Sequence, residues 1–127
     1  MPMADNPAKA VILAVDDTPE NLDVVKGVLG ADYMIRAAIN GRIALKIAEK
    51  QQPDLILLDI RMPGMDGYEV CQALKSDPQT AGIPVVFLSG EHDDSSKAKA
   101  FELGAVDFIT KPLNGSALKS CVENILG

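Results

Sequence analysis

The sequence predicts an α/β fold in which five parallel strands form a doubly wound sheet with helices on both faces. Five short apolar segments alternate with five segments of helical periodicity, and such alternation is typical of parallel sheets. Three of the apolar segments are continuous rather than alternating, which indicates strands that are covered on both faces. The 127 residues fit one domain with its own core.

The expected strands are the five apolar segments, and right-handed crossovers join each one to the next. They cover residues 9–15, 33–39, 54–59, 83–89 and 105–110, and the first, third and fourth are the continuous ones. We expect one domain over residues 9–127, preceded by a flexible tail of residues 1–8 because that segment is short and polar.

The expected helices have recognisable ends and apolar stripes. The first has Thr18 as its N-cap, Pro19 at its first position and Gly30 at its end. The other four cover residues 41–52, 67–76, 95–103 and 115–126. The expected stripe of the helix at 41–52 consists of Ile43, Ala44, Ile47 and Ala48. The helix at 95–103 has the poorest apolar stripe and ends before Gly104, so we expect it to be the most mobile helix.

Composition excludes several classes of protein. The net charge is −6 and no long basic run occurs, which argues against direct nucleic-acid binding. Cys71 and Cys121 stand alone with a single histidine, His92, so neither a zinc site nor a disulfide is expected. No signal peptide or membrane-spanning apolar run appears, and we expect a cytoplasmic protein.

Polar side chains gather at the carboxyl ends of the expected strands. Asp16 and Asp17 follow the first strand, Asp59 ends the third, Ser89 ends the fourth and Lys111 follows the fifth. In a parallel sheet these ends share one edge, where ligands bind. Each residue alone has an ordinary explanation as a helix cap, a loop residue or a solvated charge, but together they predict a site.

The chemistry of such a site follows from its charges. Three clustered carboxylates repel one another unless cations lie between them. Lys111 supplies one positive charge, and a hard divalent ion, Mg²⁺ or alternatively Mn²⁺, would supply two more. An aspartate carboxylate can accept a phosphoryl group, and the lysine, metal and hydroxyl would stabilise the charge on its oxygens.

Four motifs resemble the receiver domain of bacterial two-component response regulators, including chemotaxis regulators. These are "VDDTPEN", "LILLDIRMPGMDGYEV", "VVFLSG" and "GAVDFITKP", and the resemblance covers residues 9–127. It implies a flavodoxin-like (βα)5 fold with strand order 2-1-3-4-5.

The resemblance also implies roles for the site residues. Asp59 would be the phosphoacceptor, and Lys111 would pair first with Asp59 and later with the phosphoryl group. Asp17, Asp59 and the backbone carbonyl of Arg61 would bind Mg²⁺ directly, whereas Asp16 would act largely through water.

Further positions would serve switching and phosphoryl lifetime. Ser89 would turn inward to bind the phosphoryl group, and Phe108 fills the aromatic switch position, where it acts by packing alone. Pro112 matches a position with a cis peptide. We hypothesise that an ion pair between Arg61 and Glu91 slows hydrolysis, and two independent solvated side chains are the alternative.

The implied function is a phosphorelay signalling switch that catalyses only its own phosphorylation and slow autodephosphorylation. A sensor histidine kinase or a histidine phosphotransfer protein would phosphorylate Asp59. The surface of the fourth helix, fifth strand and fifth helix would then control an output partner, a fused effector domain or a phosphorylation-dependent homodimer. The motifs resemble receivers fused to cyclic-dinucleotide or other signalling output domains, so a stand-alone receiver and a piece of a longer protein are both open.

Three other functions compete with this interpretation. A haloacid-dehalogenase-like phosphatase needs DxDx[TV] after the first strand, where this chain has "DDTP". A nucleotide-binding fold would carry GxxxxGK[ST] or GxGxxG, and this chain has neither motif. A degenerate receiver that only binds partners is disfavoured because Asp16, Asp17, Asp59, Ser89 and Lys111 are all present.

Overall fold

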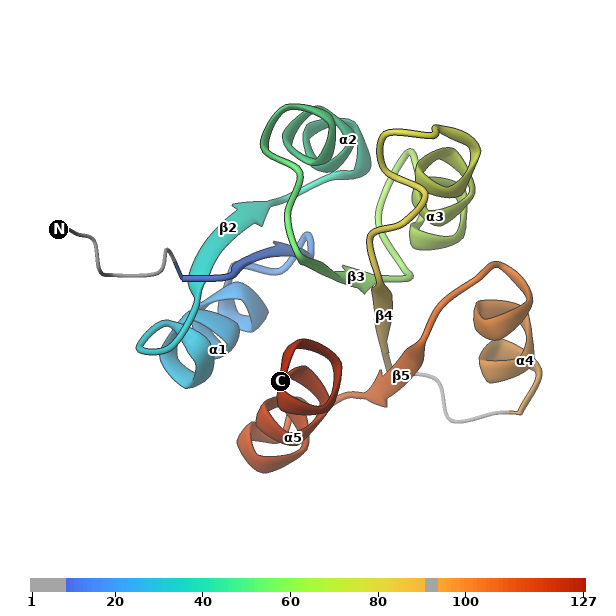
Figure 1. Cartoon of the computed structure of the whole chain (residues 1–127). Coiled ribbons are helices and arrows are strands. Elements are labelled where there is room, and N and C mark those ends of the chain that lie inside the picture. Colours follow the sequence, from blue (N-terminus) through green and yellow to red (C-terminus); the bar gives the residue numbers. More distant parts are fainter. Residues whose placement is uncertain (1–8, 91–93) are drawn as a thin grey trace, which may run out of the picture.

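The computed structural model describes residues 9–90 and 94–127 and contains five strands that alternate with five helices (Figure 1). The strands are β1 Val11–Val15, β2 Met34–Ala38, β3 Leu55–Asp59, β4 Val85–Ser89 and β5 Asp107–Thr110. The helices are α1 Pro19–Leu29, α2 Gly41–Gln51, α3 Gly67–Ser76, α4 Asp94–Glu102 and α5 Gly115–Leu126. The expected flexible tail, residues 1–8, lies outside the described residues.

The five strands form one parallel sheet in the order β2-β1-β3-β4-β5, which confirms the predicted flavodoxin-like topology. Every residue of β3 and β4 is buried, as is β1 from Ile12 onward. The edge strands β2 and β5 are partly exposed. The three continuous apolar segments are therefore the three inner strands, because only these need an apolar side chain on both faces.

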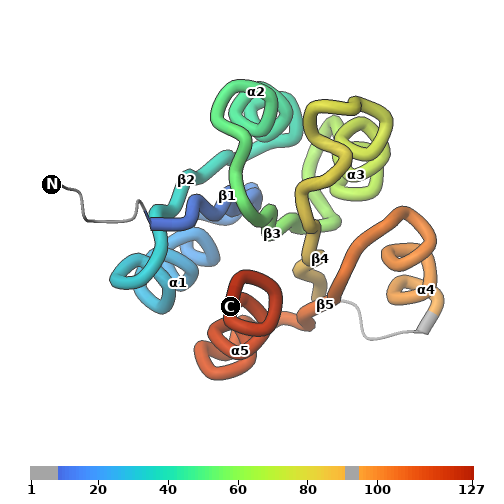
Figure 2. Tube along the Cα trace, viewed as in Figure 1, coloured from blue at the N-terminus to red at the C-terminus, as the bar shows by residue number. Residues whose placement is uncertain are grey.

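Helices cover both faces of the sheet, with α2, α3 and α4 on one face and α1 and α5 on the other (Figures 1 and 2). Alternate residues of β3 contribute to the two cores. Ile56 and Leu58 pack on the α2, α3 and α4 side, whereas Leu55 and Leu57 pack on the α1 and α5 side. This double burial fixes β3 in the middle of the molecule, and Asp59 at its end is fixed with it.

The helix ends match the sequence signals in position but not always in mechanism. Thr18 occupies the N-cap of α1 and Pro19 follows it, yet the Thr18 side chain makes no capping hydrogen bond. Gly30 closes α1 in a right-handed conformation, with φ −66°, so its position does not need glycine's left-handed freedom. Gly104 after α4 does, since its φ is +100°.

The residues that α2 and the described part of α4 bury are small ones. On α2 the expected apolar stripe is buried at Ala44 and Ala48, but Ile43 is 39% exposed. Among the described side chains of α4 only Ser96 and Ala100 are buried. None of the described helices has the length and apolar character of a membrane span.

Candidate functional site

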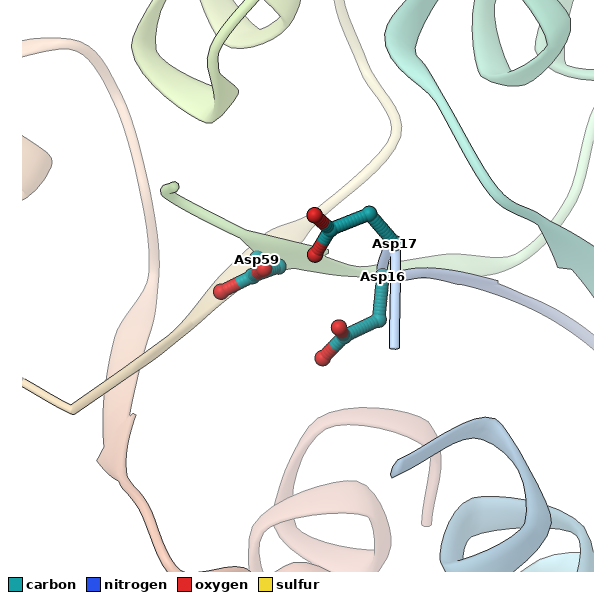
Figure 3. A group of neighbouring side chains, drawn as sticks. All are labelled: Asp16, Asp17 and Asp59. Carbon is teal, nitrogen blue, oxygen red and sulfur yellow. The ribbon is translucent and has the colours of Figure 1, made fainter. Parts of the chain in front are cut away.

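The carboxyl ends of the strands bring the polar side chains singled out from the sequence to one edge of the sheet. Asp16 and Asp17 follow β1 directly, Asp59 is the last residue of β3, Ser89 is the last residue of β4, and Lys111 follows β5. The side chains of Asp16, Asp17 and Asp59 extend into the same space beyond the strand ends (Figure 3). The parallel topology alone explains this convergence.

Backbone hydrogen bonds continue the ladder past the last strand residues and hold the site in place. The N–H of Asp16 donates to the carbonyl of Ala38 at 3.1 Å, and the N–H of Lys111 donates to the carbonyl of Ser89 at 2.6 Å. Ser89 and Asp16 are both 1% exposed and Asp59 is 4% exposed, whereas Asp17 is exposed. The site is therefore rigid and buried on its strand side and open to solvent at Asp17.

Lys111 joins two of the three acids. Its Nζ lies 2.9 Å from Oδ2 of Asp16 and 3.0 Å from Oδ1 of Asp59. The ammonium thus donates to two carboxylates at the ends of different strands. One of them, Asp59, lies 52 residues before Lys111 in the sequence. Charge-assisted hydrogen bonds of this length are among the stronger polar contacts in proteins.

The pKa values of this pair reflect burial and mutual contact. The pKa of Asp59 is raised from 3.8 to about 6, chiefly by burial; the hydrogen bond from Lys111 lowers this pKa, and the charge of Asp16 adds to the rise. Burial acting alone would lower the pKa of Lys111, but the hydrogen bonds to Asp16 and Asp59 outweigh it and raise that pKa. Lys111 therefore stays charged, whereas Asp59 lacks full compensation for its negative charge.

The acids can provide that compensation by binding a cation. Asp16, Asp17 and Asp59 can each offer one carboxylate oxygen such that all three oxygens lie within 4.8 Å of one another. A hard divalent ion such as Mg²⁺ prefers oxygen ligands and keeps several waters, and exposed Asp17 gives those waters access. The donor set and the uncompensated charge both fit such an ion.

The loop after β3 turns back underneath Asp59. Gly64 has φ +80°, and the N–H of Gly67 donates to the carbonyl of Ile60 at 2.7 Å. A Cβ at Gly67 would lie 2.2 Å from the carbonyl oxygen of Asp59, so any side chain there would force the backbone to shift. This close approach explains why a glycine follows the phosphoacceptor candidate so soon.

The remaining residues predicted for the site lie around this edge. Phe108 is half-buried on β5 and pairs in register with Phe87 of β4. The Lys111–Pro112 peptide bond is cis. Arg61 is exposed beside Asp59, but Glu91 lies outside the described residues, so the proposed ion pair between them stays a prediction.

Sequence reasoning missed one side chain that touches the site. Nδ2 of Asn21 donates to Oδ2 of Asp16 at 3.1 Å, and the N–H of Thr18 donates to Oδ1 of Asp16 at 2.9 Å. The available signal was a polar amide in the first turn of the helix that begins three residues after Asp16. The sequence signals of that turn, Thr18 and Pro19, indicate helix capping alone.

Comparisons with known proteins agree with this geometry. A family model described as the response regulator receiver domain matches residues 12–123. Over 94% of its length, the chain is 44% identical to a probable cyclic di-GMP phosphodiesterase from Vibrio cholerae. Over 91% of its length, it is 41% identical to the response regulator PleD from Caulobacter vibrioides. The crystallised Vibrio cholerae chemotaxis protein CheY4 is 32% identical, with a TM-score of 0.88 over 93% of this chain and 99% of that one.

The chain spans only about a quarter of the two curated relatives, 27% of the first and 26% of the second. The similarity to CheY4, in contrast, covers nearly all of both chains. The shared region is therefore the same domain in all three proteins.

Proposed function

The chain belongs to the response regulator receiver family, and from this premise we propose that it accepts a phosphoryl group on Asp59 and acts as a phosphorylation-dependent switch. The observation that carries the proposal is the position of Lys111. Its ammonium contacts Asp16 and Asp59 together, at the edge where three carboxylates can share one cation. A purely structural ion pair would not need a third, exposed acid beside it.

In the proposed reaction a carboxylate oxygen of Asp59 attacks the phosphorus of a phosphohistidine. The new P–O bond forms as the P–N bond breaks, and the imidazole leaves with the bonding electron pair. A Mg²⁺ ion held by Asp17, Asp59, the Arg61 carbonyl and, through water, Asp16 would neutralise charge on the phosphoryl oxygens. Lys111 would exchange its contact with Asp59 for one with the phosphoryl group, which keeps the ammonium paired throughout.

We further propose that Ser89 and Phe108 pass the signal to the outer surface. Ser89 is at the end of β4, where its hydroxyl could bind the phosphoryl group, and Phe108 lies on the neighbouring strand. The surface formed by α4, β5 and α5 exposes Phe101 of α4 at 48%, and Val106, directly before β5, is 50% exposed. An output partner, a fused effector domain or a second phosphorylated copy would bind this surface.

The partners on the input side would be a sensor histidine kinase or a histidine phosphotransfer protein. Because the two curated relatives are between three and four times as long as this chain, we propose that the domain at residues 9–127 is joined to an output domain, such as the phosphodiesterase that the name of one relative gives. Arg61 and Glu91 would tune the lifetime of the phosphoryl group in either setting.

The direct test is incubation with acetyl phosphate and Mg²⁺. We expect a phosphorylated protein whose phosphate is released by hydroxylamine, the behaviour of an acyl phosphate, and no labelling of Asp59→Asn. Glu123→Gln, an exposed substitution on α5, is the control and should label normally. No labelling despite Mg²⁺ binding would favour the pure interaction module, and steady turnover of an added phosphomonoester would favour the phosphatase.

A further inference from the structure

We propose that Asn21 is a positioning residue of the site, which holds the carboxylate of Asp16 in the orientation that a hydrated cation requires. The inference rests on the proposed function, since it concerns the same acidic site. Its basis is a contact between the first turn of α1 and an acid that is 1% exposed.

The start of α1 holds both oxygens of Asp16. Oδ1 accepts from the backbone N–H of Thr18 at 2.9 Å, and Oδ2 accepts from the side-chain amide of Asn21 at 3.1 Å. The backbone N–H of Asn21 donates to the carbonyl of Thr18 at 3.1 Å, so the amide is anchored to the same turn. Asp16 is thereby tied to the helix that follows it as well as to the strand that precedes it.

The side-chain amide of Asn21 fills one of the acceptor positions on the carboxylate of Asp16. A carboxylate has about four acceptor positions, two on each oxygen. Asn21 and Lys111 occupy both positions on Oδ2, at 3.1 Å and 2.9 Å, and Thr18 occupies one on Oδ1. None of these three donors takes the second position on Oδ1, so a water of the cation shell can use it, in keeping with the water-mediated role that the resemblance implies for Asp16.

Without the amide, Oδ2 of Asp16 keeps only Lys111, and Lys111 also contacts Asp59. The carboxylate could then turn with the lysine side chain. A group that orients a metal site from outside the direct ligands typically contributes 10–100-fold to affinity. Because Thr18 still holds Oδ1, we expect the lower end, about a tenfold weaker Mg²⁺ affinity for Asn21→Ala.

If Asn21 only stabilised α1, its replacement would act through the helix and not through the orientation of Asp16, and three variants separate the two roles. Alanine has a higher helix propensity than asparagine, and Asn21 is half-buried, so Asn21→Ala should leave α1 intact. Asn21→Leu, which keeps a similar side-chain volume without a donor, guards against an effect of lost packing. Asn124→Ala makes the same exchange at an exposed position of α5 and should leave the affinity unchanged.

The experiment is a double-mutant cycle on Mg²⁺ affinity, measured by isothermal titration calorimetry because the chain has no tryptophan. We expect both Asn21→Ala and Asn21→Leu to weaken binding about tenfold in the wild-type background and less than twofold in an Asp16→Asn background. In the metal-free protein, Asp16→Asn should also shift the side-chain amide resonances of Asn21 in the nitrogen–proton NMR spectrum.

Two results would overturn the inference while leaving the proposed function intact. One is wild-type affinity in both Asn21 variants, and the other is an equal loss in the two backgrounds, since the amide would then not act through Asp16. A third result would instead overturn the proposed function. If the wild-type protein bound no Mg²⁺ while the Asn21 amide resonances still responded to Asp16→Asn, the contact would exist but would not serve metal binding.

Discussion

The carboxyl edge of the central strands and helix α4 are held by very different amounts of packing. Asp59 ends a strand in which all five residues are buried, and its neighbours Asp16 and Ser89 are each 1% exposed. On α4 only Ser96 and Ala100 are buried among the described side chains, and Phe101 is 48% exposed. A cation–π contact joins this helix to α3, where Nζ of Lys99 lies 4.4 Å from the ring centroid of Tyr68.

This difference corresponds to two tasks in the proposed switch. Phosphoryl transfer needs groups that keep one geometry, and residues on strands buried on both faces provide it. A surface that changes on phosphorylation needs an element whose displacement costs little, and few buried apolar contacts give that property. Substitutions at the strand ends should therefore change stability much more than substitutions on α4, and four predictions test this contrast.

The largest effect is expected from Lys111→Met without divalent ions. The change leaves Asp16 and Asp59 buried without their ammonium, which should lower the free energy of unfolding by about 3–5 kcal/mol at pH 7.5. Urea unfolding followed by circular dichroism measures it. Because a divalent ion can replace the missing charge, Mg²⁺ should stabilise the variant more than the wild type.

Lys97→Met on the exposed side of α4 is the matched control and should change stability by about 0.5 kcal/mol or less. An equal effect of the two substitutions would remove the contrast between the regions. A large loss at Lys111 that Mg²⁺ does not reverse would show that packing, rather than charge, explains it.

The second prediction concerns pH. Because the pKa of Asp59 is raised from 3.8 to about 6, the folded protein binds its proton more tightly than the unfolded chain does. In the absence of metal, this residue should make the fold less stable as pH rises from about 4 to about 6, by about 3 kcal/mol in total. The measurement is the difference in unfolding free energy between wild type and Asp59→Asn at several pH values.

Mg²⁺ should show the opposite dependence, because it binds the ionised carboxylate. Its affinity should be constant above about pH 6 and fall about tenfold for each pH unit below that value. A pH-independent difference between wild type and Asp59→Asn would mean that the raised pKa is absent.

Third, Gly67→Ala should lower the unfolding free energy by about 1–3 kcal/mol, since the new Cβ meets the backbone of Asp59 and Ile60. Gly27→Ala, at an α1 position with nothing within 4 Å of the added Cβ, should instead stabilise by about 0.5–1 kcal/mol. Gly67→Ala should also phosphorylate more slowly with acetyl phosphate, because the clash displaces Asp59. Normal rates in Gly67→Ala would show that the loop yields without moving the site.

The sequence allowed the strands and helices to be predicted to within two residues, because apolar runs, Pro19 and Gly104 are local signals. The order of the strands came only from the family resemblance, since no local pattern says which strands pair. Likewise, an apolar stripe indicates which face of a helix points toward the core, but not how much of that face the neighbouring elements cover. Ile43 is exposed for that reason, although it lies on the same stripe as Ala44.

The site shows the same division. That Asp16, Asp59 and Lys111 would meet follows from strand ends that share an edge, and the structure has them within hydrogen-bonding distance. Two other features depend on rotamers within one helical turn: the hydrogen bond from Asn21 to Asp16, and the missing capping hydrogen bond of the Thr18 side chain. Side-chain type and spacing do not specify those rotamers.

The smallest effect is expected on α4, from Lys99→Gln. A cation over an aromatic ring at an exposed position contributes about 0.5–1 kcal/mol, and Lys99 is exposed, so the unfolding free energy should fall by no more than that. Lys97→Gln on the same helix has no such contact with Tyr68 and serves as the control. Backbone hydrogen exchange of α4 should nonetheless accelerate in Lys99→Gln alone, because this contact joins α4 to α3. If exchange in β3 accelerated equally, the helix would not be a separately held element, and the contrast between the two regions would fail.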